Sequence, residues 1–345
     1  MAMATFRASW IATAGFLTLG LSLPAEAENI SIPGYGDVTL SAVGNAGVLV
    51  HDGTLGATTE GDTHGQLQTV KSLVGVTWVW DIGYSHKLLA NYAYGGEFTT
   101  LDRTFEDAKP FRSAIGVSNA LGAFTYGKQP TGFFKYYGGL IDRSQDFYAT
   151  GYTTANAGGV SAFDTLKYST SYGRLAVDVD YRPAFIDGSS PLSNSFGISR
   201  QYRQYLGRFT FGGGYLHQEF RSGANDDVNR FGGAVEYGSE QWTFALGAHV
   251  VDDASAHDTR SYNLLGTFQL TQDNALHLSL AIIDDDDIYD SFLGGGYYID
   301  HRIGSQWRVY SEGAVTRAEA AGGGNVAVNT QILVGVRFDF GNIFY

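Results

Sequence analysis

Apolar and polar side chains alternate along most of the chain. Between residues 276 and 282 every even-numbered residue is apolar, while His277 and Ser279 lie at odd positions. Two further segments repeat the pattern, with apolar residues at Trp242, Phe244, Leu246, Ala248 and Val250, and at Ile332, Val334, Val336, Phe338 and Phe340. A period of two is the spacing of one face of a β-strand. The pattern predicts an all-β chain.

The connections between these segments alternate in length. Short turns are expected near residues 81–83, 121–122, 172–173, 206–207, 238–240, 272–274 and 304–305. Longer polar connections are expected near 51–67, 99–110, 130–162, 183–194, 221–228, 252–260, 284–291 and 319–326. Eight long and seven short connections join sixteen antiparallel strands, and an error of one hairpin leaves fourteen or eighteen open.

Strand length and aromatic placement distinguish a membrane barrel from a soluble sandwich, which also alternates but turns its apolar face inward. The expected strands have about 9 to 13 residues, the length that crosses a bilayer. Aromatic residues gather at strand ends, as a membrane-interface girdle requires. They include Trp78, Trp80, Tyr92, Tyr94, Phe124, Tyr126, Trp242, Trp307, Phe338 and Phe340. We therefore predict a transmembrane antiparallel β-barrel whose apolar residues face outward.

Composition fits this class. The chain has 46 Gly, 22 Tyr, 22 Phe and only 6 Pro, which suits many strands joined by tight turns. Beyond residue 27 no run of about 18 apolar residues is present, so no transmembrane helix is expected. There is no Cys, which excludes disulfides and thiolate sites. The net charge of −13 argues against nucleic acid as a partner.

The first 27 residues have the pattern of a secretory signal peptide. Arg7 supplies the positive region, residues 10–21 the apolar region, and Ala25-Glu26-Ala27 the small-x-small cleavage site. The alternative is a short N-terminal membrane helix. We expect an exported chain with one barrel domain over residues 28–345, located in the cell outer membrane.

No catalytic or cofactor motif stands out. Ser-His-Asp, zinc-protease and phosphate-loop signatures are missing, so neither enzyme activity nor a cofactor is expected. The acidic run 284–287 is typical of a solvated loop, with divalent cation binding as the alternative. The glycine triplets 212–214 and 294–296 fall within expected strands, where glycine eases curvature or subunit contact.

One segment carries a family resemblance. Residues 111–129, which read Phe-Arg-Ser-Ala-Ile-Gly-Val-Ser-Asn-Ala-Leu-Gly-Ala-Phe-Thr-Tyr-Gly-Lys-Gln, resemble the fourth and fifth strands of the general diffusion porins of Gram-negative bacteria. Residues 164–168 and 73–76 resemble the openings of their sixth and second strands. The resemblance implies that the long third loop, residues 130–162, folds into the barrel and narrows it.

The same resemblance implies a constriction with basic side chains on the wall and acidic ones on the loop. The wall candidates are Lys71, Arg112, Lys128 and Lys167, and the loop candidates are Asp142, Arg143 and Asp146. Alternation turns Lys71, Arg112 and Lys167 inward and leaves the direction of Lys128 open. The chain departs from the family in its loop, which lacks Pro-Glu-Phe-Gly-Gly, and at its C-terminal end, which continues past Phe340.

The resemblance therefore implies a passive, water-filled channel for ions and small hydrophilic solutes. Its expected partners are outer-membrane lipid, lipopolysaccharide and two further copies of the chain in a homotrimer. A substrate-selective channel is one alternative. The other is a barrel-anchored surface receptor or adhesion protein with no transport role.

Overall fold

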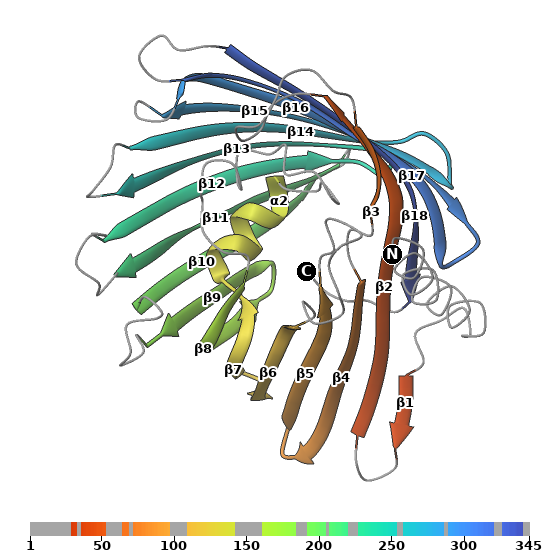
Figure 1. Ribbon diagram of the computed structural model, residues 1–345. Coiled ribbons are helices and arrows are strands. Elements are labelled where there is room, and N and C mark those ends of the chain that lie inside the picture. Colours follow the sequence, from red (N-terminus) through yellow and green to blue (C-terminus); the bar gives the residue numbers. More distant parts are fainter. Residues whose placement is uncertain are drawn as a thin grey trace, which may run out of the picture.

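The computed structural model describes residues 29–32, 36–52, 64–68, 72–96, 109–141, 161–183, 192–204, 207–219, 227–253, 258–285, 289–320 and 326–340. These residues form one curved antiparallel sheet with two short helical segments inside it (Figure 1). None of the helices in these ranges is long and apolar enough to cross a membrane.

The elements have the following bounds: β1 Asn29–Ile32, β2 Gly36–Asp52, β3 His64–Gln68, β4 Ser72–Gly83, β5 His86–Gly96, β6 Lys109–Asn119, β7 Gly122–Pro130, η2 Phe134–Gly138, α2 Gly139–Ile141, β8 Ser161–Tyr172, β9 Leu175–Arg182, β10 Leu192–Gln204, β11 Gly207–Glu219, β12 Val228–Gly238, β13 Trp242–Asp253, β14 Thr259–Gln269, β15 Asn274–Asp285, β16 Tyr289–Ile303, β17 Trp307–Ala320 and β18 Val326–Phe340.

The sheet closes into a ring. From β4 to β18 each strand pairs with the next, and β2 pairs with both β4 and β18. The short strand β3 pairs with the part of β2 beyond β4, and β1 pairs with the part of β2 beyond β18. Without these two pieces, sixteen strands of the described chain form the ring, which confirms the predicted number. A closed ring has no unpaired sheet edge.

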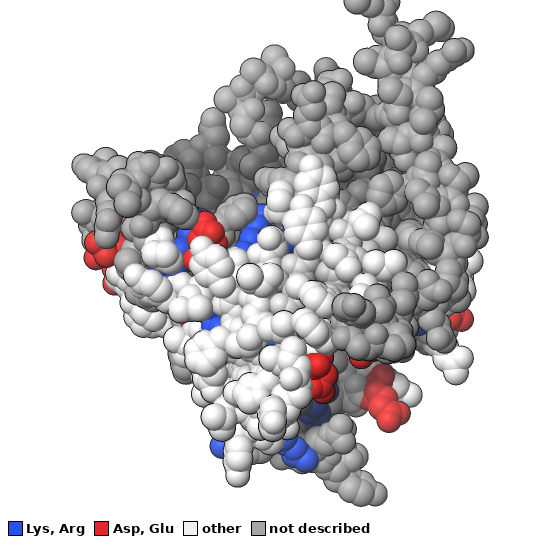
Figure 2. All heavy atoms as spheres, turned by 90° about the horizontal axis from the view of Figure 1, so that it is seen from below, with Lys and Arg blue, Asp and Glu red and all other residues white. Residues whose placement is uncertain are grey.

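Side-chain exposure shows which way the two faces point. Ile115 on β6 is 66% exposed and Leu246 on β13 is 57% exposed, both on the outside of the ring. Asp178 on β9 is fully buried on the inside, and Lys167 and Glu236 are nearly so. The predicted inversion, with apolar residues outward and polar residues inward, is confirmed. Figure 2 shows one outer face, where most described atoms are uncharged and the charged ones lie mainly toward its edges.

Aromatic pairs lie on the outer face of the ring near the ends of the strands. Near the short turns, Trp78 stacks on Trp80 with ring centroids 5.8 Å apart, and Trp307 contacts Phe338 at 5.0 Å. The tight turns need backbone that few residues adopt: Tyr84 and Ser85 both have positive φ, the geometry of a two-residue hairpin turn. The described short turns lie within a few residues of their predicted positions.

Candidate functional site

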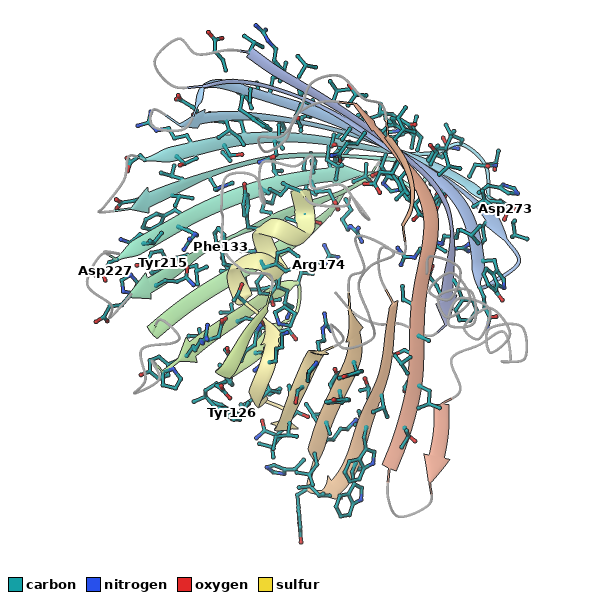
Figure 3. All side chains as sticks on the ribbon, viewed as in Figure 1. Tyr126, Phe133, Arg174, Tyr215, Asp227 and Asp273 are labelled. Atoms are coloured by element: carbon teal, nitrogen blue, oxygen red, sulfur yellow. The ribbon has the colours of Figure 1, made fainter. Side chains whose placement is uncertain are left out.

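The long connection after β7 turns into the ring at once. Thr131 Oγ1 accepts a hydrogen bond from Phe134 N at 3.2 Å, and Thr131 O accepts one from Lys135 N at 3.0 Å. These bonds start the segment η2–α2, a π-helical turn followed by a short α-helical turn, which we call the inner helix. Figure 3 shows Phe133 inside the ring beside these turns and Tyr126 of β7 on its outside. The predicted inward folding of the third loop is confirmed for residues 131–141.

The inner helix packs on the wall through its own apolar core. The core contains Phe133, Phe134, Tyr137 and Ile141 of the loop segment, together with Leu216 of β11 and Ala234 of β12, and all of them are buried. Two other hydrophobic clusters of buried residues occur in the described chain, one around Tyr310 and Leu333 and one around Ile283 and Phe292. Burial of the core of the inner helix holds the start of the loop against strands β10 to β14.

A buried carboxylate on β9 also holds the inner helix, through ion pairs and hydrogen bonds. Asp178 Oδ2 lies 2.9 Å from Lys135 Nζ of the inner helix and 3.1 Å from Lys167 Nζ of β8. Tyr136 OH donates to Asp178 Oδ1 at 2.9 Å. One turn away, Gly132 N donates to Asp180 Oδ2 at 2.8 Å. Three charges and a phenol thus meet where the loop leaves the wall.

Tyr137 binds the wall on the side of the inner helix away from Asp178. Its hydroxyl lies 2.7 Å from His249 Nδ1 of β13 and accepts from Asn263 Nδ2 of β14 at 3.5 Å. Burial raises the pKa of both Tyr136 and Tyr137 above the usual value, with the charge of Asp178 adding to the effect at Tyr136. Both phenols therefore stay protonated at ordinary pH and can donate their hydrogen bonds.

The predicted wall residues do not all lie on the inner face of the ring. Arg112 is half-buried on the inner face of β6, opposite Ala93 in the register. Lys167 is buried on the inner face of β8, as predicted. Lys128 pairs in the register with exposed Ser113, which puts it on the outer face, and its Nζ donates to Pro110 O at 2.8 Å. We therefore leave Lys128 out of the inner wall. The side chain of Lys71 lies outside the described residues.

The loop candidates Asp142, Arg143 and Asp146 also lie outside the described residues. Within those residues, the ion pair between loop and wall has the polarity opposite to the one that the resemblance implies. The loop contributes the cation, Lys135, and the wall contributes the anion, Asp178. Sequence reasoning missed this pair, although Asp178 and Asp180 alternate with Val177 and Val179 on β9 and so could be assigned to the inner face.

A second charged group lines the inner face near the short turns of β16 to β18. Arg308 lies 2.7 Å from Asp300 and 3.3 Å from Asp339, and Arg337 binds the same Asp339 at 2.7 Å. The bridge ties three consecutive strands near the closure of the ring. No group of three or more His, Cys, Asp or Glu side chains in the described ranges is arranged to hold a metal ion.

Comparison with known proteins identifies the fold. No protein-family model matches the chain, and no curated protein matches it in sequence. Solved structures do match. The outer membrane channel DcaP of Acinetobacter baumannii superposes with a TM-score of 0.69 and 12% identity, over 90% of this chain and 99% of that one. The chain has the porin fold.

Two further structures with the porin fold support this. Salmonella typhi OmpF, solved with daunomycin, gives a TM-score of 0.68 and 12% identity, over 91% of this chain and all of that one. An anion-selective porin from Comamonas acidovorans gives 0.63 and 15%, over 88% and 99% of the two chains. The superpositions thus cover about nine tenths of the chain, at a sequence identity of 12 to 15%.

Proposed function

We propose that the chain forms a passive, water-filled channel for ions and small hydrophilic solutes in a Gram-negative outer membrane. One observation carries the proposal: the ring has an apolar outer face and a charged inner face, and a chain segment packs inside it. An apolar belt suits hydrocarbon, and a polar bore suits water. The two structural neighbours described as an outer membrane channel and an anion-selective porin support the same function.

In this proposal the molecule carries out no reaction and needs no cofactor. Solutes cross down their own gradient through the space that the loop leaves free. Arg112 and Lys167 are the wall charges at the narrowing, with Lys71 as a further wall candidate. Asp142, Arg143 and Asp146 complete it from the loop. Charges on opposite sides of a narrow bore set up a field that selects ions by sign.

We also propose that residues 1–27 are a cleaved signal peptide and that the mature chain is a homotrimer in contact with lipid and lipopolysaccharide. The outer face of β17 and β18 supports the trimer. In the middle of the two strands the described outward residues are aliphatic or small, including Val315, Ile332 and Val334, and Arg317 follows on β17 toward the long-loop end, whereas β7, β11 and β13 present Phe or Tyr outward. A flat aliphatic face suits a subunit contact, and bulky aromatics suit the lipid interface.

Planar-bilayer recording of the purified protein tests the channel. Large ohmic conductance that does not saturate with solute supports a general porin. Saturation by one solute indicates the selective alternative, and the absence of conductance would leave only a barrel-anchored surface protein.

The ion preference of the channel tests whether Arg112 is part of the constriction. We expect Arg112→Ala to raise cation preference, because it removes a positive charge from the bore. Arg174→Ala is the matched control, since Arg174 is exposed in the short turn between β8 and β9. The measurement is the reversal potential under a salt gradient. An equal response of the two variants would remove Arg112 from the constriction.

A further inference from the structure

Four glycines on neighbouring strands face the inner helix. They are Gly197 on β10, Gly212 on β11, Gly232 on β12 and Gly247 on β13. The register places them in two adjacent inward rows: Gly197 pairs with Gly214, which pairs with Gly232, while Gly212 pairs with Ala234, which pairs with Gly247. Elsewhere the inner face holds side chains as large as Leu265 and Tyr310. We call these four glycines the glycine seat.

The inner helix fills the space that side chains on the seat would need. A Cβ added at Gly232 would lie 2.8 Å from Tyr137 Cδ1, and one at Gly247 would lie 2.5 Å from Ile141 Cγ2. At Gly212 it would lie 2.7 Å from Leu140 Cδ1 and would overlap Tyr136 O. Distances under 3.0 Å are too short for a real Cβ, so the helix lies directly on the backbone of the wall.

Polar contacts hold the helix at both edges of the seat. On the β9 side, Asp178 binds Lys135 and Tyr136. On the β13–β14 side, His249 and Asn263 bind the hydroxyl of Tyr137. His249 is the register partner of Gly232, and Asn263 is the register partner of Gly247, so the seat ends where these polar side chains begin. The glycines let the inner helix lie close to the backbone of the wall, and the polar side chains fix its position along the wall.

We propose that the glycine seat is the specificity-determining part of the wall, because the size of the side chain at these positions sets how far the loop projects into the bore. This inference rests on the proposed channel function. A side chain at these positions moves the inner helix off the backbone of the wall by a large part of a side-chain diameter. This displacement is large compared with the width of a narrow bore. The glycines at positions 197, 212, 232 and 247 thus set the bore without touching the solute.

The first experiment tests the placement and needs no transport assay. Because the chain has no Cys, the pair Ile141→Cys with Gly247→Cys introduces the only two thiols. We expect a disulfide to form under mild oxidation, detected as loss of free thiol and a shifted band after unfolding without reductant. The control pair is Ile141→Cys with Gly233→Cys, in which the second thiol faces outward and no disulfide should form.

The second experiment compares two neighbouring glycines of β12. We expect Gly232→Leu to change the single-channel conductance by about twofold or more. Gly233→Leu should leave conductance unchanged, because Gly233 is exposed on the outer face and a Cβ there meets nothing within 4 Å. Folding is checked by the heat-dependent gel mobility of the barrel. If Gly232→Leu does not fold, Gly232→Ala takes its place.

The outcomes separate the two proposals. If the wild-type protein does not conduct, the channel fails, while the disulfide result still decides where the helix sits. If it conducts, the seat is overturned by either of two results: no disulfide between positions 141 and 247, or equal conductance of the variants at 232 and 233.

Discussion

At the scale of single residues, Asp178 is the most constrained charge of the described bore. It is fully buried on β9 and lies between two amines and a phenol from two other elements, the inner helix and β8. A buried carboxylate is tolerated only when such partners replace its water. The two cations that bind Asp178 also have a second carboxylate nearby, because Asp180 is the register partner of Lys167.

Removing this carboxylate should make the bore more selective for anions. In Asp178→Asn the inner wall gains one unit of positive charge. A unit charge about 8 Å away in water is worth roughly 0.5 kcal/mol, favourable for an anion and unfavourable for a cation, which together correspond to about a fivefold change in the ratio of anion to cation permeability. The reversal potential under a salt gradient measures it.

The control is Asp273→Asn, which makes the same change of charge at an exposed short turn between β14 and β15. A shift of equal size in both variants would mean that the total charge, and not the position of Asp178, determines the preference.

At the scale of the element, the inner helix depends on two phenols that must stay protonated. Burial favours the neutral form of Tyr136 and Tyr137, so their pKa is raised above 10 in the docked loop. In an undocked loop both would titrate near the usual value of about 10. A raised pKa stabilises the docked state below pH 10, and that stabilisation is lost as pH rises above it.

We therefore expect the loop to resist proteolysis up to about pH 10 and to become susceptible above it. Limited digestion with an alkaline-active protease at about pH 9 and about pH 11 measures this. The double variant Tyr136→Phe with Tyr137→Phe lacks both phenols and should show a smaller difference in cleavage between the two pH values. A wild-type loop that is cleaved equally at both would contradict the role of the phenols.

The strands and the inner helix differ in how far the sequence predicts them. Strand number, turn positions and the direction of Arg112 and Lys167 follow from alternation, because a period of two assigns every residue to one face. The inner helix has no such signal: it is a single π-helical turn stabilised by contacts with strands far along the chain. Gly212 illustrates the limit of prediction from sequence. The triplet 212–214 predicts eased strand curvature or a subunit contact, whereas the position of Gly212 opposite Tyr136 depends on the folded ring.

At the scale of the whole molecule, the ring has two kinds of outer surface. Aromatic side chains such as Phe211 and Tyr262 stand out from β11 and β14, whereas the middle of β17 and β18 presents Val315, Ile332 and Val334. In the proposed trimer, the aliphatic arc forms the contact with neighbouring copies of the chain and the aromatic arc faces lipid.

A charge on the aliphatic arc should break the proposed trimer. We expect Val334→Arg to yield monomers in light scattering of the detergent-solubilised protein. Val179→Arg is the matched control, because Val179 is an outward valine of β9 with similar exposure, 47% against 53%. Trimers in both variants would place the subunit contact elsewhere on the ring.

The hydrogen bonds between β2 and β18 have a further consequence for biogenesis. The register places Val48 opposite Val334, so the ring is closed by segments that lie nearly a whole chain length apart. Because these two segments lie at opposite ends of the chain, the ring can close only after both have been synthesised. Until then each margin is an unpaired sheet edge that can pair with other chains.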